Sequence, residues 1–324
     1  MACTLKASLA AVALIAALTP ASAQQFPNRP ITLVVPLPPG GTNDIMARII
    51  GERMTKSLGQ QIVVENRAAG GSGTVATRQV ARSTPDGYTI LLSYTTTFAT
   101  GPSMYKNAGY DVRKDFAPIG LIAVSPSLVI ANKDFPIKTI PELLAHIRKT
   151  NEPFQYGAPG IGSVNHLAAE MFARAAKIKL MAIPYKGSNP LVTDLIAGHI
   201  KMGFNPIPVS RGALEGGLIR ALAVTSAKRS SQLPDVATLA EQGLPGFDVS
   251  LRYGLSAPAG TPGAIVDQLN KALNAALADD AVIKRIRHEG AEPAPTTSQQ
   301  YAADIDAEET RWSAVVKELG LTGN

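Results

Sequence analysis

Short apolar runs alternate with segments of helical periodicity along most of the chain. The runs rich in Val, Ile, Leu and Phe lie at 31–35, 61–65, 88–93, 116–124, 127–132, 154–158, 180–184, 201–205 and 220–224. Apolar residues recur at helical spacing in other segments, among them 44–57, 74–83, 264–277, 281–288 and 298–319. This alternation predicts an α/β fold in which helices flank mostly parallel strands.

The first strand leads into a loop of prolines and glycines that opens a helix. Prolines end the strand because they have no N–H for the ladder, and Thr42 or Asn43 can cap the helix that follows. A helix start leaves backbone N–H groups without intrahelical partners and suits a carboxylate or phosphate. The alternative is an ordinary strand-to-helix connection. The candidate contacts in this loop are Pro39, Gly40, Gly41, Thr42 and Asp44.

The same design recurs twice in the second half of the chain. The strand at 154–158 is followed by Gly160, Gly162 and the cap candidate Ser163, with His166 one helical turn on. The strand at 180–184 is followed by Tyr185, a glycine and Ser188, which can cap the next helix. Two glycine-bearing loops in different parts of the chain favour an anion site over the ordinary connection.

Hydroxyl groups gather after the strand at 88–93. Tyr94, Thr95 and Thr97 stand at its carboxyl end, where open α/β sheets bind ligands. These side chains either contact a ligand or satisfy the backbone of their own loop, and the sequence leaves both alternatives open.

The first 23 residues have the pattern of a signal peptide. One basic residue, Lys6, precedes an apolar core at 9–18, and small residues end the segment at Ala23. A transmembrane anchor is the alternative, but the apolar core is too short to span a bilayer comfortably. Cys3 is the only cysteine, so the mature chain would contain no thiol and no disulfide.

Charge and motif content exclude several function classes. The net charge of +6 falls to +5 when Lys6 is removed, and no basic stripe interleaved with aromatic residues supports nucleic-acid binding. The Gly71, Gly73 and Ala76 pattern lies too far beyond its strand for a dinucleotide fingerprint. Four scattered histidines form no metal-ligand motif. We therefore expect no cofactor and no metal.

With these loops in view, the chain resembles the substrate-binding receptors of tripartite tricarboxylate transporters, the Bug or TctC-type periplasmic proteins. The segments that carry the resemblance are 29–36, 40–44, 47–48, 59–60, 64–67, 85–88, 115–119, 160–163, 166–167, 184–187, 220–224, 233–235, 243–246 and 257–262. The resemblance implies a two-lobe periplasmic binding protein, type II-like, with a hinge between lobes. After the signal peptide at 1–23, we expect lobe 1 at 24–124, lobe 2 at 125–248 and a return to lobe 1 at 249–324.

The resemblance also implies the function and its partners. The ligand would be a small carboxylate held between the first loop and the loop at 160–163, partly through ordered water. The receptor, expected to be a monomer, would deliver it in the periplasm to the membrane permease subunits of the transporter. It would not be an enzyme.

Two departures from the family pattern bear on specificity. Many relatives have tryptophan at the position of Arg252 and aspartate at the position of Asn205. A neutral Asn205, with Arg252 near the cleft, favours a dicarboxylate without an amine over an amino acid. The alternative is that Arg252 points to solvent.

Two other functions remain open at this point. In a secreted hydrolase, Ser163 and His166 would share one face of a helix, although the G-x-S-x-G pattern is missing. In a sensor, the same fold would report to a membrane signalling protein, and no residue separates this function from transport.

Overall fold

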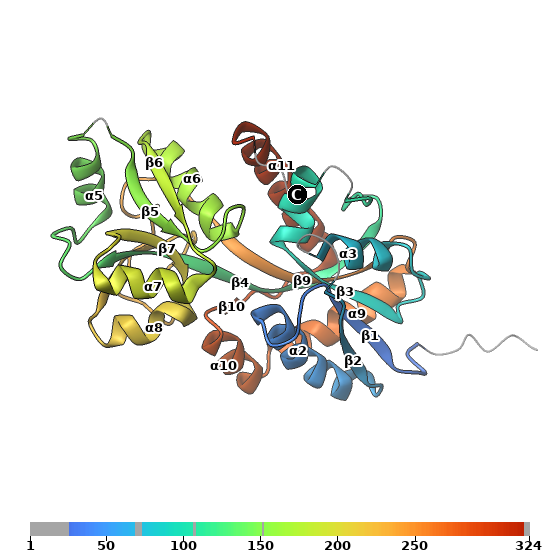
Figure 1. Cartoon of the computed structure of the whole chain (residues 1–324). Helices are drawn as coiled ribbons and strands as arrows, with labels where there is room; N and C mark the ends of the chain where they lie inside the picture. The colour runs from blue at the N-terminus through green and yellow to red at the C-terminus, as the bar shows by residue number, and fades with distance from the viewer. Residues whose placement is uncertain (1–25, 69–72, 106–107, 151, 321–324) are drawn as a thin grey trace, which may run out of the picture.

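The computed structural model describes residues 26–68, 73–105, 108–150 and 152–320. The expected signal peptide and Gly71 lie outside these residues. The strands form a mixed sheet in the order β2-β1-β3-β9-β4-β7-β5-β6, with β8 and β10 also paired to β4. Helices cover the sheet, and the molecule has two lobes joined by long strands (Figure 1). The expected α/β two-lobe fold is confirmed.

Lobe 1 is the part built on the first strands of the sheet. Its β1, β2 and β3 are parallel, and β9 runs antiparallel beside β3. The central β1 is almost wholly buried, as a strand covered on both faces requires. The elements of this lobe are β1 (Ile31–Val35), α2 (Thr42–Leu58), β2 (Ile62–Asn66), α3 (Thr74–Ala81), β3 (Thr89–Tyr94), the π-helix η2 (Thr96–Thr100), α4 (Gly101–Met104), β9 (Ser250–Pro258), α9 (Gly263–Leu277), α10 (Asp280–His288) and β10 (Glu292–Pro293).

Lobe 2 has its own parallel strands and its own core. β5 pairs in parallel with β6 and β7, and the hydrophobic core of this lobe includes Tyr156, Phe172 and Phe204. Its elements are α5 (Ile140–Ile147), β5 (Phe154–Ala158), α6 (Val164–Ala176), β6 (Leu180–Pro184), α7 (Ser188–Ala197), β7 (Met202–Pro206), α8 (Ile207–Glu215) and β8 (Ile219–Val224).

A single long strand, β4 (Phe116–Asn132), passes through both lobes. Its residues 116–126 pair with β9 in lobe 1, and 127–132 pair with β7 and β8 in lobe 2. The prediction of two separate strands here was wrong, because the backbone continues through Ser125 and Pro126 while its partners change. All pairs with β4 are antiparallel, so the sheet is mixed rather than mostly parallel.

The last helix, α11 (Ser298–Glu318), also contacts both lobes. It begins with a capping box in which Thr297 and Gln300 bond each other's backbone. Tyr301 packs in a lobe 1 core, whereas Trp312 packs in the lobe 2 core. We expected all three terminal helices to pack on lobe 1 alone. That holds for α9. The His288 carbonyl at the end of α10 also accepts a hydrogen bond of 3.4 Å from Arg211 of α8 in lobe 2, and α11 spans the junction because its apolar residues continue along its whole length.

Candidate functional site

The first glycine loop leaves the start of α2 uncapped. Gly41 is the N-cap residue, and no side chain in the described part of the chain caps this helix, whose first N–H groups have no intrahelical partner either. Gly40 has φ of +86°, a conformation that L side chains rarely adopt. Among the described residues, no atom lies within 4 Å of the position where a Cβ on Gly40 or Gly41 would stand. The loop therefore presents unpaired N–H donors and an open face.

Asp44 holds this loop in shape. Its Oδ2 accepts a hydrogen bond of 2.9 Å from the Gly40 N–H, and its Oδ1 lies 3.0 Å from the Arg48 guanidinium. Burial raises the pKa of Asp44, but hydrogen bonds from Arg48, Gly40 and Asn66 outweigh burial and hold the pKa below its ordinary value. Because Arg48 balances its charge, Asp44 shapes the loop without repelling an anion.

Asn43, beside Asp44, was not among the predicted contacts. The residue is 7% exposed, and its Oδ1 has no hydrogen-bond partner among the described residues. A buried amide oxygen without a partner costs free energy unless water or a ligand satisfies it. The Asn at this helix start could have been singled out from the sequence by its place in the loop.

The second glycine loop, in lobe 2, is held by its own side chains. The Ser163 hydroxyl donates to the Gly160 carbonyl at 2.8 Å and accepts from the His166 N–H at 3.2 Å, which makes Ser163 the N-cap of α6. Gly160 has φ of +111°, and no atom of the residues that the structure describes lies within 4 Å of the position where its Cβ would stand. Gly162 packs against lobe 1, because a Cβ there would lie 2.7 Å from Met104.

His166 supports this loop and is not part of a hydrolytic pair. Its Nδ1 accepts a hydrogen bond of 3.2 Å from the Gly162 N–H, so the neutral ring carries its proton on Nε2. Burial lowers the pKa of His166, although the nearby Glu170 carboxylate partly opposes this effect. The Ser163 hydroxyl donates to the backbone instead of to the ring. This geometry gives Ser163 no general base.

The hydroxyls after β3 bond the protein itself. Thr97 Oγ1 donates to the Tyr94 carbonyl at 3.0 Å, and Thr95 Oγ1 accepts from the Arg252 N–H at 2.8 Å. Tyr94 packs in the lobe 1 core, where burial raises its pKa above the ordinary tyrosine value. Of the two alternatives left open, the structure favours self-satisfaction of the loop backbone for Thr97, whereas Thr95 bonds the backbone of β9 and Tyr94 packs in the core.

Two candidate residues of lobe 2 have partners inside the lobe. The Tyr185 hydroxyl donates to Asp194 at 2.8 Å, and burial together with this bond raises the pKa of Tyr185 to about 12. Asn205 is fully buried and donates to the Ser210 hydroxyl at 3.0 Å, while its Oδ1 has no partner among the described residues. Asn205 therefore has one acceptor left for a water or a ligand group.

Arg252 does not point to solvent, and it lines a cavity between the lobes. Its guanidinium lies 3.0 Å from Asp304, 3.3 Å from Glu308 and 3.4 Å from Asp248. Burial raises the pKa of Glu308, although Arg252 and Arg311 partly offset this rise. The alternative in which Arg252 points to solvent was wrong, because Asp304 and Glu308 of α11, far along the chain, hold its guanidinium together with Asp248, four residues before it. Arg252 is a structural ion-pair centre at the junction of the lobes.

The third loop, between β6 and α7, lies beside the second. β5 and β6 are in register up to their last residues, and the Tyr185 N–H bonds the Ala158 carbonyl at 2.8 Å. Gly187 is the N-cap of α7, and no side chain caps this helix. Ser188 does not have the predicted capping role. Two glycine loops thus lie at one edge of lobe 2.

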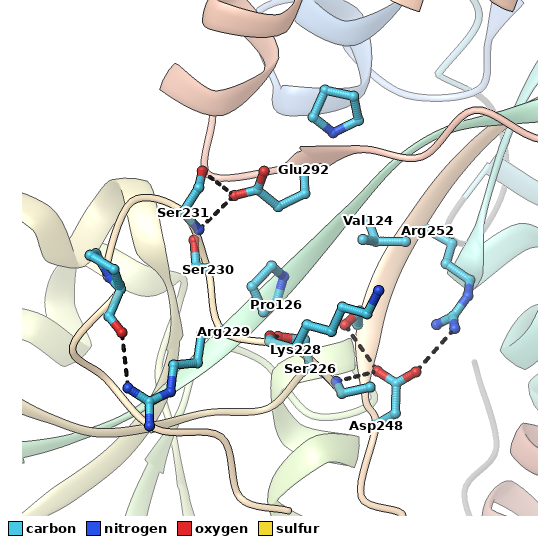
Figure 2. A pocket seen from close by; sticks show the side chains of 14 residues that line it. Val124, Pro126, Ser226, Lys228, Arg229, Ser230, Ser231, Asp248, Arg252 and Glu292 are labelled. Carbon is cyan, nitrogen blue, oxygen red and sulfur yellow. Dashed lines mark hydrogen bonds and ion pairs between the residues drawn. The ribbon is translucent and has the colours of Figure 1, made fainter. Parts of the chain in front are cut away.

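A separate cavity of about 650 Å³ lies beside the crossing strands (Figure 2). Val124 and Pro126 of β4, Glu292 and Pro293 of β10, and residues 226–231 are among its lining. In the described part of the chain, no three His, Cys, Asp or Glu side chains are arranged to hold a metal ion. None of the described helices has the length and apolar character needed to cross a membrane.

Comparisons with known proteins agree with this architecture. The model of the tripartite tricarboxylate transporter family receptor, TctC, matches residues 46–321. An R. palustris protein solved with adipate is 37% identical, with a TM-score of 0.75 over 92% of this chain and 99% of that one. The periplasmic binding protein BugD is 38% identical, with a TM-score of 0.72 over 92% and 100%. A TctC solute binding protein from Polaromonas, with no ligand, is 27% identical, with a TM-score of 0.81 over 90% and 99%.

Proposed function

Since the chain belongs to the tripartite tricarboxylate transporter receptor family, we propose that it binds a small dicarboxylate between its lobes and delivers it to the membrane subunits of such a transporter. Receptors of this family are solute-binding proteins, so the chain is a binding protein and not an enzyme. We place it in the periplasm, as BugD is described, exported by the segment at 1–23 and acting as a monomer.

The uncapped start of α2 is the observation that carries this proposal. One short stretch of lobe 1 holds N–H donors, glycine faces and an Asn43 oxygen that no described residue contacts or bonds. A carboxylate accepts hydrogen bonds from such donors and is favoured by the helix dipole. Adipate in the R. palustris relative is a ligand of this chemical class.

The second lobe contributes the opposite side of the site. We assign ligand contact to the backbone around Gly160, whose open face lies at the carboxyl end of β5. Ser163 and His166 hold that loop, and Gly187 extends the donor surface at the next strand. Polar groups that are already fixed need no reorganisation when the ligand arrives.

Ligand binding then favours closure of the lobes. A dicarboxylate that contacts donors of both lobes makes more hydrogen bonds when the lobes approach, so it shifts the population toward the closed arrangement. We place the hinge where β4 and β9 pass between lobes, with lobe 2 at 125–248. Between transport and signalling we favour transport, because the matched family consists of transporter receptors.

A calorimetric ligand panel tests the proposal. The mature chain is titrated with adipate, succinate and malate, and in parallel with aspartate and glutamate. Because Asn205 is neutral, no carboxylate at its position pairs with an ammonium group, and we expect the amine-free diacids to bind more tightly. Tighter binding of aspartate or glutamate would refute the amine-free specificity, and no binding of any diacid would refute the function.

A further inference from the structure

Asn205 stands at the carboxyl end of β7, beside the second glycine loop. β5 and β7 run parallel, with Gly157 opposite Gly203. Two residues further along the strands, Asn205 is therefore level with the residue that precedes Gly160. Asn205 thus lies next to the backbone to which we assign ligand contact in lobe 2.

The Asn205 side chain lies on the face of the sheet that α7 and α8 cover. Its partner across the ladder is Leu128 of β4, which belongs to the core between the sheet and these helices. Leu191 of α7 packs over Gly203, two residues before Asn205 on the same face. Because α7 begins at the carboxyl end of β6, its first turn, which precedes Leu191, lies toward Asn205.

The first turn of α7 carries N–H donors. Gly187 is its N-cap, and no side chain of the described residues caps the helix. Pro190 has no N–H, so the donors without an intrahelical partner are those of Ser188 and Asn189. A carboxylate accepts hydrogen bonds from such groups.

The orientation of the Asn205 amide is fixed by Ser210 of α8. The Ser210 hydroxyl donates its one proton to the Pro206 carbonyl at 3.0 Å, so it accepts from the Asn205 Nδ2, also at 3.0 Å. Oδ1 is therefore the end of the amide that faces away from Ser210. This oxygen is buried and has no hydrogen-bond partner among the described residues. An acceptor of β7 and donors of α7 thus occupy the same end of lobe 2.

Lobe 1 repeats this combination at the start of α2. The start of that helix has uncapped N–H groups, and the Oδ1 of Asn43 in its first turn is buried without a partner in the described part of the chain. Both amide oxygens are shielded from solvent, so neither gives up a bond to water when a donor reaches it. Each lobe therefore offers donors for a carboxylate together with one acceptor for a neutral donor.

We propose that the ligand is a hydroxy-dicarboxylate whose hydroxyl donates to the Oδ1 of Asn205; this inference rests on the proposed function. In a 2-hydroxycarboxylate the carboxylate takes the N–H donors and the neighbouring hydroxyl satisfies the amide oxygen. A plain diacid leaves that oxygen unpaired, which costs free energy. An ammonium group would be buried opposite a neutral amide, which does not offset its lost hydration.

The unmodified mature chain gives the first test. Titration calorimetry compares succinate, L-malate and D-malate, which carry two carboxylates on the same four-carbon chain. We expect one malate enantiomer to bind roughly tenfold more tightly than succinate and than the other enantiomer, because the acceptor is fixed in place. Equal affinities for all three would overturn this inference and leave the binding of dicarboxylates intact. Binding of neither these acids nor adipate would refute the proposed function, and this inference with it.

A matched pair of variants then tests the assignment to Asn205. Asn205→Leu removes the acceptor, whereas Asn132→Leu removes another buried amide of lobe 2, one that bonds the Leu195 carbonyl toward the end of α7. We expect Asn205→Leu to bring the malate and succinate affinities within about twofold of each other, and Asn132→Leu to keep the difference seen in the parent. An unchanged difference in Asn205→Leu, or its loss in Asn43→Leu alone, would overturn the assignment.

Asn205→Asp gives a readout that does not depend on loss of binding. It keeps an oxygen acceptor and adds a negative charge, which pairs with an ammonium group. We expect the affinity for aspartate relative to L-malate to rise by roughly tenfold or more over the parent. Thermal melting of each variant checks that it folds, and if Asn205→Leu does not fold, Asn205→Asp decides the assignment. An aspartate-to-malate ratio equal to that of the parent would overturn the contact between Asn205 and the ligand.

Discussion

The start of α2 can be tested with a substitution that removes a single donor. Thr42 is the first residue of the helix, a position where proline is tolerated because its missing N–H has no intrahelical partner. Gly41 before it has φ of −83° and ψ of 169°, which suits a residue that precedes proline. Thr42→Pro thus deletes one N–H donor and keeps the helix, whereas Thr42→Ala keeps the donor and removes only the side chain.

The expected loss of affinity follows from the charge on the ligand. A hydrogen bond to a charged group contributes about 1.5–3 kcal/mol, and every 1.4 kcal/mol is roughly a factor of ten in Kd. If the N–H donates to the carboxylate directly, Thr42→Pro should weaken binding at least about tenfold, while Thr42→Ala should stay within about twofold of the parent. A bridging water would reduce the effect, because removal of one of its partners leaves others.

Isothermal titration with the tightest diacid of the panel measures this difference, and far-UV circular dichroism checks that α2 still forms. Equal affinity of Thr42→Pro and Thr42→Ala would refute the assignment of the α2 N–H groups as ligand donors. A loss in both variants would assign the contact to the Thr42 side chain instead.

Three further predictions concern stability. Arg252→Met takes one of two cations from the buried Glu308 and the cation from the partly exposed Asp304, so it should cost up to about 3 kcal/mol. Arg285→Met, at an exposed ion pair, should cost under about 1 kcal/mol, and equal melting temperatures of the two variants would contradict the ion-pair centre. Gly73→Ala would put a Cβ 2.2 Å from a backbone carbonyl oxygen and should lower the free energy of unfolding by more than about 3 kcal/mol. Gly59→Ala has only the cost of the left-handed conformation, roughly 1–2 kcal/mol. Similar urea midpoints for the two variants would count against the close contact at Gly73. Burial lowers the pKa of His166 in the folded protein. The contribution of this neutral histidine to stability is therefore complete above the ordinary histidine pKa of about 6.5 and declines as the pH falls below it. If the free energy of unfolding of His166→Gln falls just as steeply between pH 7 and pH 5, another group is responsible.

The local features of the fold follow from the sequence because they rest on local chemistry. The first strand was predicted with the bounds that the structure gives it, since its β-branched run is ended by prolines. The glycine-bearing starts of α2 and α6 were predicted for the same reason.

Features that depend on distant partners could not be predicted in the same way. The continuity of β4 through Pro126 depends on β9, which lies more than a hundred residues further along the chain. The burial of Arg252 depends on carboxylates of α11, and no local pattern around Arg252 indicates them. The span of α11 across both lobes is set by which cores receive Tyr301 and Trp312.

A crystal structure of the mature chain with the tightest diacid tests the central claim most directly. We predict one carboxylate with oxygens about 2.7–3.2 Å from N–H groups at the start of α2, directly or through one ordered water, and the loop around Gly160 closed over it from the other lobe. A diacid bound in the cavity beside Glu292, or bound with the two glycine loops directed away from it, would contradict the account.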